Sequence, residues 1–145
     1  MWIYFKGGHM VSIVAATERH SKKEKVRLDA RGEKLLQVRG RREEDVKLFA
    51  RACGSPRANV IETPKADYRF RVVLPADRVS VGMARMALEV DYPNFKDTIK
   101  EADRKDVASS VWATTLKLDP RNIWDRFWDR EDTDDDENRD FHDLL

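Results

Sequence analysis

Short runs of apolar residues alternate with charged segments along the chain, and the period of the apolar positions changes three times. Residues 2–5 and 10–16 are rich in β-branched and aromatic side chains and flank Gly7-Gly8. This pattern predicts a β-hairpin. Residues 19–34 are mostly charged, which predicts a long solvated connection with an irregular hairpin around residues 30–32. Residues 35–39 alternate again and predict a third strand.

From residue 43 the apolar positions take a helical spacing. Val46, Phe49, Ala50 and Cys53 recur three or four residues apart after an acidic start. The following Gly-Ser-Pro sequence, residues 54–56, ends this helix. Residues 60–63 and 68–74 then predict two more strands.

Two further helices are predicted in the second half of the chain. The first begins with Asp77 as its N-cap and ends at Pro93, and the second covers residues 103–118. The residues expected to be buried are Val79, Met83, Met86, Ala87 and Val90 in the first helix, and Val107, Val111, Trp112 and Leu118 in the second.

The expected order is strand, strand, strand, helix, strand, strand, helix, helix. This order predicts an α+β fold, in which an antiparallel sheet of about five strands carries two or three helices packed on one face. We assign residues 1–120 to this domain and residues 121–145 to an acidic aromatic tail. The tail is expected to be partly disordered, because residues 131–145 have too few apolar side chains to offset the entropy of ordering.

Charge is segregated along the chain. Residues 129–145 contain nine acids and two bases, a net charge of −7; the remaining 26 bases and 18 acids give residues 1–128 a net charge of +8. Cys53 is the only cysteine, which excludes an intramolecular disulfide and the usual paired-cysteine zinc site. The sequence contains no long apolar run and no signal-peptide pattern, so we expect a cytoplasmic protein with no membrane segment, metal or cofactor.

Several strings resemble a family of small uncharacterised bacterial and phage proteins. The most specific are Thr63-Pro-Lys-Ala-Asp-Tyr-Arg69 and Asp91-Tyr-Pro-Asn-Phe-Lys96, within a likeness that covers residues 2–118. The resemblance implies a compact α+β domain from a bacterium or bacterial virus and brings no residue roles with it. The charged segment 19–34 and the acidic tail depart from the family pattern.

A basic surface is one candidate site. Guanidinium and ammonium groups neutralise phosphates, and Tyr68 or Phe70 beside them could stack on an unpaired base. The alternative is that the arginines of residues 68–74 form only the solvated face of a strand. The candidate nucleic-acid-binding residues are Arg39, Arg41, Arg42, Lys47, Arg51, Arg69 and Arg71.

The turn at residues 91–96 combines a carboxylate, a phenol, an amide and an amine. It could bind a small polar ligand, or Asp91 or Asn94 could cap the helix that follows. No catalytic residue is assigned, because the three histidines are scattered and no nucleophile–base spacing or phosphate-binding glycine loop is present.

The acidic tail is the candidate protein-binding site. Ile123, Trp124, Phe127 and Trp128 share one face of a short helix, which could dock into a partner's groove or onto its own domain. The assigned residues are Trp124, Phe127, Trp128, Asp134, Asp135, Asp136 and Phe141. The sequence therefore predicts a non-enzymatic regulator or inhibitor that binds a protein partner through its body and tail. The alternatives are a nucleic-acid-binding domain with an autoinhibitory tail, and a small-ligand-binding domain or enzyme.

Overall fold

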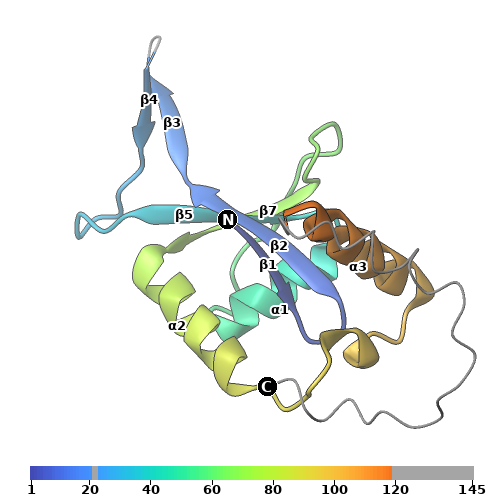
Figure 1. The fold of residues 1–145 in the computed structure, drawn as a ribbon. Coiled ribbons are helices and arrows are strands. Elements are labelled where there is room, and N and C mark those ends of the chain that lie inside the picture. Colours follow the sequence, from blue (N-terminus) through green and yellow to red (C-terminus); the bar gives the residue numbers. More distant parts are fainter. Residues whose placement is uncertain (21–22, 119–145) are drawn as a thin grey trace, which may run out of the picture. The chain divides into compact units, whose positions relative to one another are not determined.

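A computed structural model describes residues 1–20 and 23–118, and the structural statements below concern these residues. The chain divides into two units, Met1–Ala108 and Ser109–Leu145. The predicted α+β class is confirmed, with a five-stranded antiparallel sheet and three α-helices among the described residues (Figure 1).

The main sheet has the order β1-β2-β5-β7-β6, so β1 and β6 are its edges. Its strands are β1 (Trp2–Phe5), β2 (His9–Ala15), β5 (Leu35–Gly40), β6 (Ile61–Glu62) and β7 (Phe70–Pro75). The register places Val11 opposite Ile3, and Val38 opposite both Ile13 and Val72. Because side chains alternate along a strand, these apolar residues share one face of the sheet.

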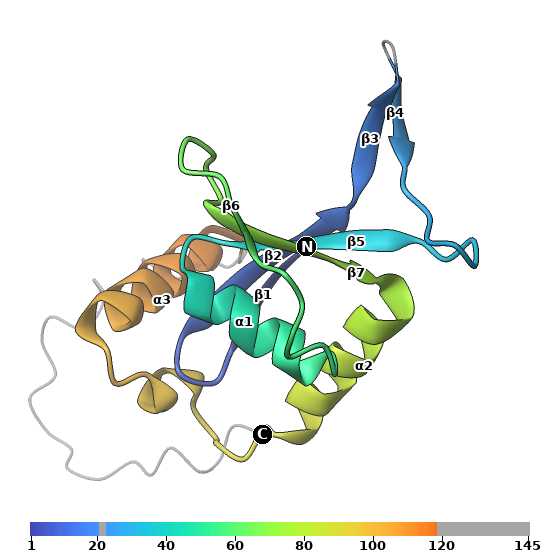
Figure 2. The same cartoon turned by 180° about the vertical axis from the view of Figure 1, so that it is seen from behind.

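Helices α1 (Glu43–Ala52) and α2 (Ala76–Leu88) pack on that face and on each other. Figure 2 shows both helices in front of the sheet. After α2 the chain forms a short 3-10 helix, η1 (Phe95–Thr98), then α3 (Ala102–Thr115) and η2 (Leu116–Leu118). The core residues are Val11, Ile13, Val38, Val46, Phe49, Ala50, Cys53, Val72, Leu74 and Val79.

The β1–β2 hairpin forms as predicted, because its turn contains two glycines. Gly7 and Gly8 have φ angles of 85° and 77°, in the left-handed region that favours glycine. At Gly8 a Cβ atom would also lie only 3.1 Å from Cβ of Arg104. The second glycine therefore allows α3 to begin directly against the hairpin.

The charged segment after β2 is more ordered than the sequence suggested. Strands β3 (Thr17–His20) and β4 (Lys23–Val26) pair into a separate antiparallel hairpin. The sequence analysis predicted only a solvated connection here and missed these two strands. The sequence of these strands has no apolar residue at every second position, so the hydrophobic pattern gave no signal. The turn expected near residues 30–32 is present, with Gly32 at φ 80°.

The two later helices differ from their predictions. Asp77 is not an N-cap, because α2 begins one residue earlier and Asp77 Oδ1 accepts a hydrogen bond from the N–H group of Arg78. The helix also ends at Leu88, before Val90, and both Ala87 and Val90 are exposed rather than buried. In α3 the expected inward residues Val107, Val111, Trp112 and Leu118 are exposed, whereas Arg104 and Ala108 are buried. The start of α3 is held by a polar contact of Arg104 and not by a stripe of apolar side chains.

Cys53 is fully buried at the end of α1, and burial raises the pKa of its thiol to about 11. At pH 8 only about one thiol in a thousand would be ionised, and the thiolate is the reactive form. We expect the native chain to react at least 100-fold more slowly with a disulfide reagent at pH 8 than the urea-unfolded chain. Rapid stoichiometric labelling of the native chain would contradict the burial of Cys53.

Candidate functional site

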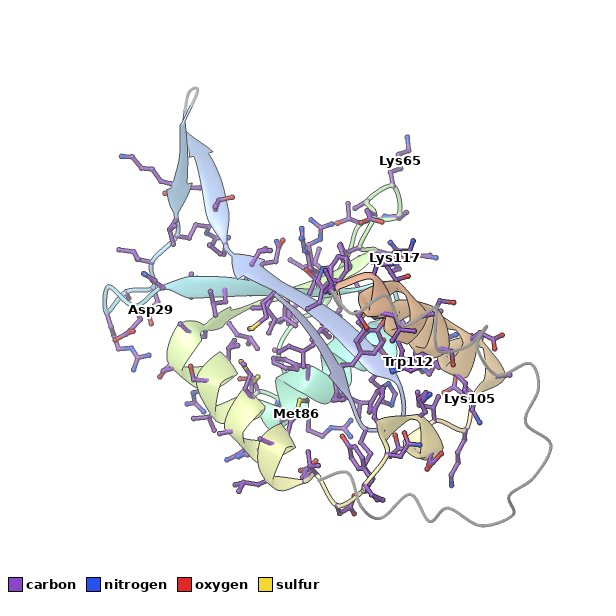
Figure 3. The ribbon with its side chains drawn as sticks, in the orientation of Figure 1. Asp29, Lys65, Met86, Lys105, Trp112 and Lys117 are labelled. Atoms are coloured by element: carbon purple, nitrogen blue, oxygen red, sulfur yellow. The ribbon has the colours of Figure 1, made fainter. Side chains whose placement is uncertain are left out.

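A cleft of about 680 Å³ opens between β1, α1 and α2. Leu48, Arg51 and Ala52 reach it from α1 at helical spacing, and Met83 and Met86 reach it from α2. In Figure 3, Met86 lies on the side of α2 that faces α1. The sheet ends at β1, so no further strand covers these methionines, which remain half-buried.

The charged residues that line the cleft are mainly basic. Lys6, Arg51 and Arg85 contribute three cations, against the single carboxylate of Glu89. Lys6 is paired with Asp91 at 2.7 Å, and its hydrogen bond lowers the pKa of that carboxyl. The cleft thus combines an apolar floor with a net positive rim.

The unpaired edge of β1 borders this cleft. The terminal ammonium group of Met1 donates to the carbonyl of Ile13 at 2.9 Å, and the carbonyl of Met1 accepts from the N–H group of Ile13 at 2.8 Å. In an antiparallel pair the bonded positions alternate, so the register makes Ile3 and Phe5 the next bonded residues. The backbone groups of Trp2 and Tyr4 therefore point away from β2, where no strand of the described chain pairs with them.

A buried ionic cluster forms one end of the cleft. Asp45 accepts hydrogen bonds from Nη2 of Arg104 at 2.8 Å and from the N–H group of Met10 at 3.2 Å, and it lies 2.7 Å from Nδ1 of His9. Arg104 also donates to the carbonyl of Gly8 at 3.2 Å and contacts Glu44. These contacts join the β1–β2 turn, α1 and the start of α3.

His9 is the member of the cluster that lines the cleft. Its ring stacks on Phe5, with 5.3 Å between the ring centroids, and Asp45 fixes its orientation. A histidine held by a carboxylate can act as a base toward a nucleophile. However, the described lining of the cleft contains no serine, threonine or cysteine for His9 to activate.

The turn at residues 91–96 has a structural role. Asn94 caps η1 by accepting a hydrogen bond from the N–H group of Lys96 at 3.1 Å. Phe95 packs edge-on against Tyr4, with 6.2 Å between centroids, and contacts Tyr92. Burial raises the pKa of Tyr4. The turn closes the cleft on the side of Tyr92, which is one of its lining residues.

The structure brings together only part of the predicted basic surface. Arg39 and Arg71 are opposite each other on β5 and β7, and the Arg39 and Arg41 guanidiniums lie 4.7 and 5.7 Å from the ring centroid of Tyr68. Arg71 donates to the carbonyl of Tyr68 at 3.0 Å. Tyr68 itself is buried, so its ring is not presented to an unpaired base.

The other predicted basic residues lie elsewhere or pair with acids. Arg51 lines the cleft, and Arg41, beside Tyr68, also pairs with Asp67 at 3.0 Å. The remaining pairs are Arg42 with Glu101 at 2.8 Å and with Asp103, Lys47 with Glu43 at 2.8 Å, and Arg69 with Glu62 at 2.6 Å. These carboxylates reduce the positive potential that a phosphate backbone would meet.

The predicted protein-binding residues of the tail lie outside the described residues. They are Trp124, Phe127, Trp128, Asp134, Asp135, Asp136 and Phe141. Sequence reasoning also missed the role of Met83 and Met86 as cleft residues. Their helical spacing predicted an inward face, but only the strand order shows that this face meets an open edge.

Searches of protein-family models, curated proteins and solved structures find no match to this chain. The family resemblance therefore stays a prediction. No described helix has the length and apolar character needed to cross a membrane. The described residues also include no group of three or more histidine, cysteine or acidic side chains that could hold a metal ion.

Proposed function

We propose that this domain is a protein-interaction module that binds an extended segment of a partner protein along β1. The observation that carries the proposal is the position of the unpaired β1 edge beside the open apolar cleft. Addition of a strand to an exposed sheet edge is a recurrent mode of peptide recognition. The outward backbone groups of Trp2 and Tyr4 would supply its hydrogen bonds.

The lining of the cleft specifies the chemistry of the bound segment. In an added strand every second side chain faces the side of the sheet that carries α1 and α2. Those side chains would be apolar, because they would meet Leu48, Met83 and Met86. Acidic side chains on the same face of the added strand, two or four residues from the apolar ones, would meet Arg51 and Arg85. The partner segment is therefore extended, with apolar and acidic side chains on the one face that meets the cleft.

The remaining parts of the sequence-based interpretation stay as proposals. The single, buried cysteine is compatible with a reducing cytoplasmic setting. The contribution of the acidic tail to partner binding is a separate prediction. This contribution is tested by measuring partner binding of the full chain that carries both Trp124→Ala and Trp128→Ala.

The test uses the full chain and a library of phage-displayed peptides. Ala87 and Ala84 are both exposed on α2, but only Ala87 lines the cleft, so Ala87→Glu and Ala84→Glu form a matched pair. We expect the selected peptides to carry both apolar and acidic residues at every second position, so that these side chains share one face of the added strand. Ala87→Glu should weaken their binding at least tenfold, about 1.4 kcal/mol, and Ala84→Glu less than twofold.

Nuclear magnetic resonance distinguishes strand addition from other modes of binding. A peptide paired with β1 should slow the exchange of the Tyr4 amide at least tenfold, because that N–H group becomes hydrogen-bonded. Binding of a helical peptide in the cleft would leave the Tyr4 amide unchanged and would refute strand addition. Equal effects of Ala87→Glu and Ala84→Glu would refute the cleft as the site.

A further inference from the structure

The β3–β4 hairpin is a basic arm that stands apart from the sheet. It forms its own two-stranded sheet, and Figures 1 and 2 both show it projecting away from the helices. Its base is fixed by two backbone hydrogen bonds, from Arg27 to Ala16 at 2.8 Å and from Leu35 to Arg27 at 2.9 Å. We define the arm as residues 17–20 and 23–27.

The arm lacks the apolar face that would let it pack on a protein surface. Val26 is its one apolar side chain and is 44% exposed. The register sets Glu18 opposite Lys25, and a cross-strand pair of opposite charges stabilises a hairpin by a few tenths of a kcal/mol. An isolated two-stranded hairpin is only marginally stable in water, so a binding partner would add much of its order.

The charge of the arm indicates an anionic partner. Its residues include four bases, Arg19, Lys23, Lys25 and Arg27, and two acids, Glu18 and Glu24, a net charge of +2. Lys25 and Arg27 are exposed. Unlike most of the basic residues on the body, these cations project from the domain and can approach an extended anionic surface.

We propose that the arm binds duplex DNA by inserting its two-stranded ribbon into a groove. The major groove of B-DNA is about 12 Å wide and admits a two-stranded β-ribbon. A single strand is disfavoured as the ligand, since the arm contains no Phe, Tyr or Trp on which unpaired bases would stack. Lys25 and Arg27 would contact phosphates beside the groove. This inference is independent of the peptide-binding proposal.

The test measures binding of the full chain to a fluorescein-labelled 20-base-pair DNA duplex over a range of salt concentrations. The arm variant combines Lys25→Glu with Arg27→Glu, the two bases of the arm that are described as exposed. The control combines Lys65→Glu with Lys105→Glu, two exposed lysines away from the arm (Figure 3), and has the same net charge. We expect the arm variant to bind at least tenfold more weakly and the control to change less than twofold.

The salt dependence adds a second readout. Each lost phosphate contact should reduce the slope of log K against log salt by about 0.9, so the arm variant should lose about 1.8. Three outcomes would overturn the proposal: equal weakening in both double variants, tighter binding of the single strand than of the duplex, or equally effective competition by polyglutamate. The thermal unfolding midpoint of the arm variant should match that of the control, because the arm contributes no residue to the core.

Discussion

Arg104→Met is expected to lower the free energy of unfolding by about 3–5 kcal/mol. The guanidinium of Arg104 and the carboxylate of Asp45 are both buried, and they form two hydrogen bonds of 2.8 and 3.3 Å. Methionine fills a similar volume but removes both guanidinium hydrogen bonds to Asp45, whose remaining partners are His9 and the N–H group of Met10. The cost is large because the buried carboxylate loses its permanently charged partner while it keeps most of its desolvation penalty.

The matched control is Arg42→Met. Arg42 pairs with Glu101 and Asp103, but all three of these side chains are substantially exposed. Exposed ion pairs typically contribute about 0–1 kcal/mol, so this variant should lose no more than that. Urea denaturation monitored by circular dichroism measures both variants. Similar losses for Arg42→Met and Arg104→Met would mean that the Arg104–Asp45 contact does not hold α3 to the hairpin and α1.

Gly82→Ala is expected to lower the free energy of unfolding by about 2–3 kcal/mol. A Cβ atom at this position in α2 would lie 2.4 Å from Sγ of Cys53 and 3.1 Å from its backbone nitrogen. Alanine favours a helix interior over glycine by about 1 kcal/mol. The clash must exceed that gain, because α1 and α2 would have to separate within a packed core.

Urea denaturation of two further variants locates the cause. Gly82→Ala in a Cys53→Ala background should recover part of the loss, since the sulfur is removed while the close backbone contact at 3.1 Å remains. Ser80→Ala is the control at an exposed position of the same helix. Serine already has a Cβ atom, so this change adds none and should alter the free energy of unfolding by less than about 0.5 kcal/mol. If Gly82→Ala instead stabilises the protein, the close approach of α1 and α2 at Cys53 is wrong.

The elements of the main domain could be predicted because their signals are local. Gly7-Gly8 marks the first turn, the apolar spacing from Val46 to Cys53 marks α1, and alternation marks β7. Each signal depends on neighbours within a few residues. The antiparallel sheet with its helices follows from the order of these elements.

The strand order and the ionic cluster could not be predicted in the same way. Arg104 and Asp45 are separated by 59 positions, and no period in the sequence distinguishes a buried arginine from an exposed one. The β1 edge depends on which strand occupies each position in the sheet, which also leaves Met83 and Met86 beside an open cleft. The pairing of Arg41 and Arg42 with acids was missed for a related reason, since Asp67 and Glu101 come from distant segments.

The arm is inserted between two strands that are direct neighbours. Residues 17–34 leave the sheet after β2 and return to it at β5, and the N–H group of Ala16 donates to the carbonyl of Leu35 at 2.9 Å where the two strands meet. The sheet is therefore continuous beneath this excursion, and a segment of another length or composition could replace it without shifting the register of β2 and β5. Substitutions or insertions in the arm should therefore change its binding properties while the stability of the core stays the same.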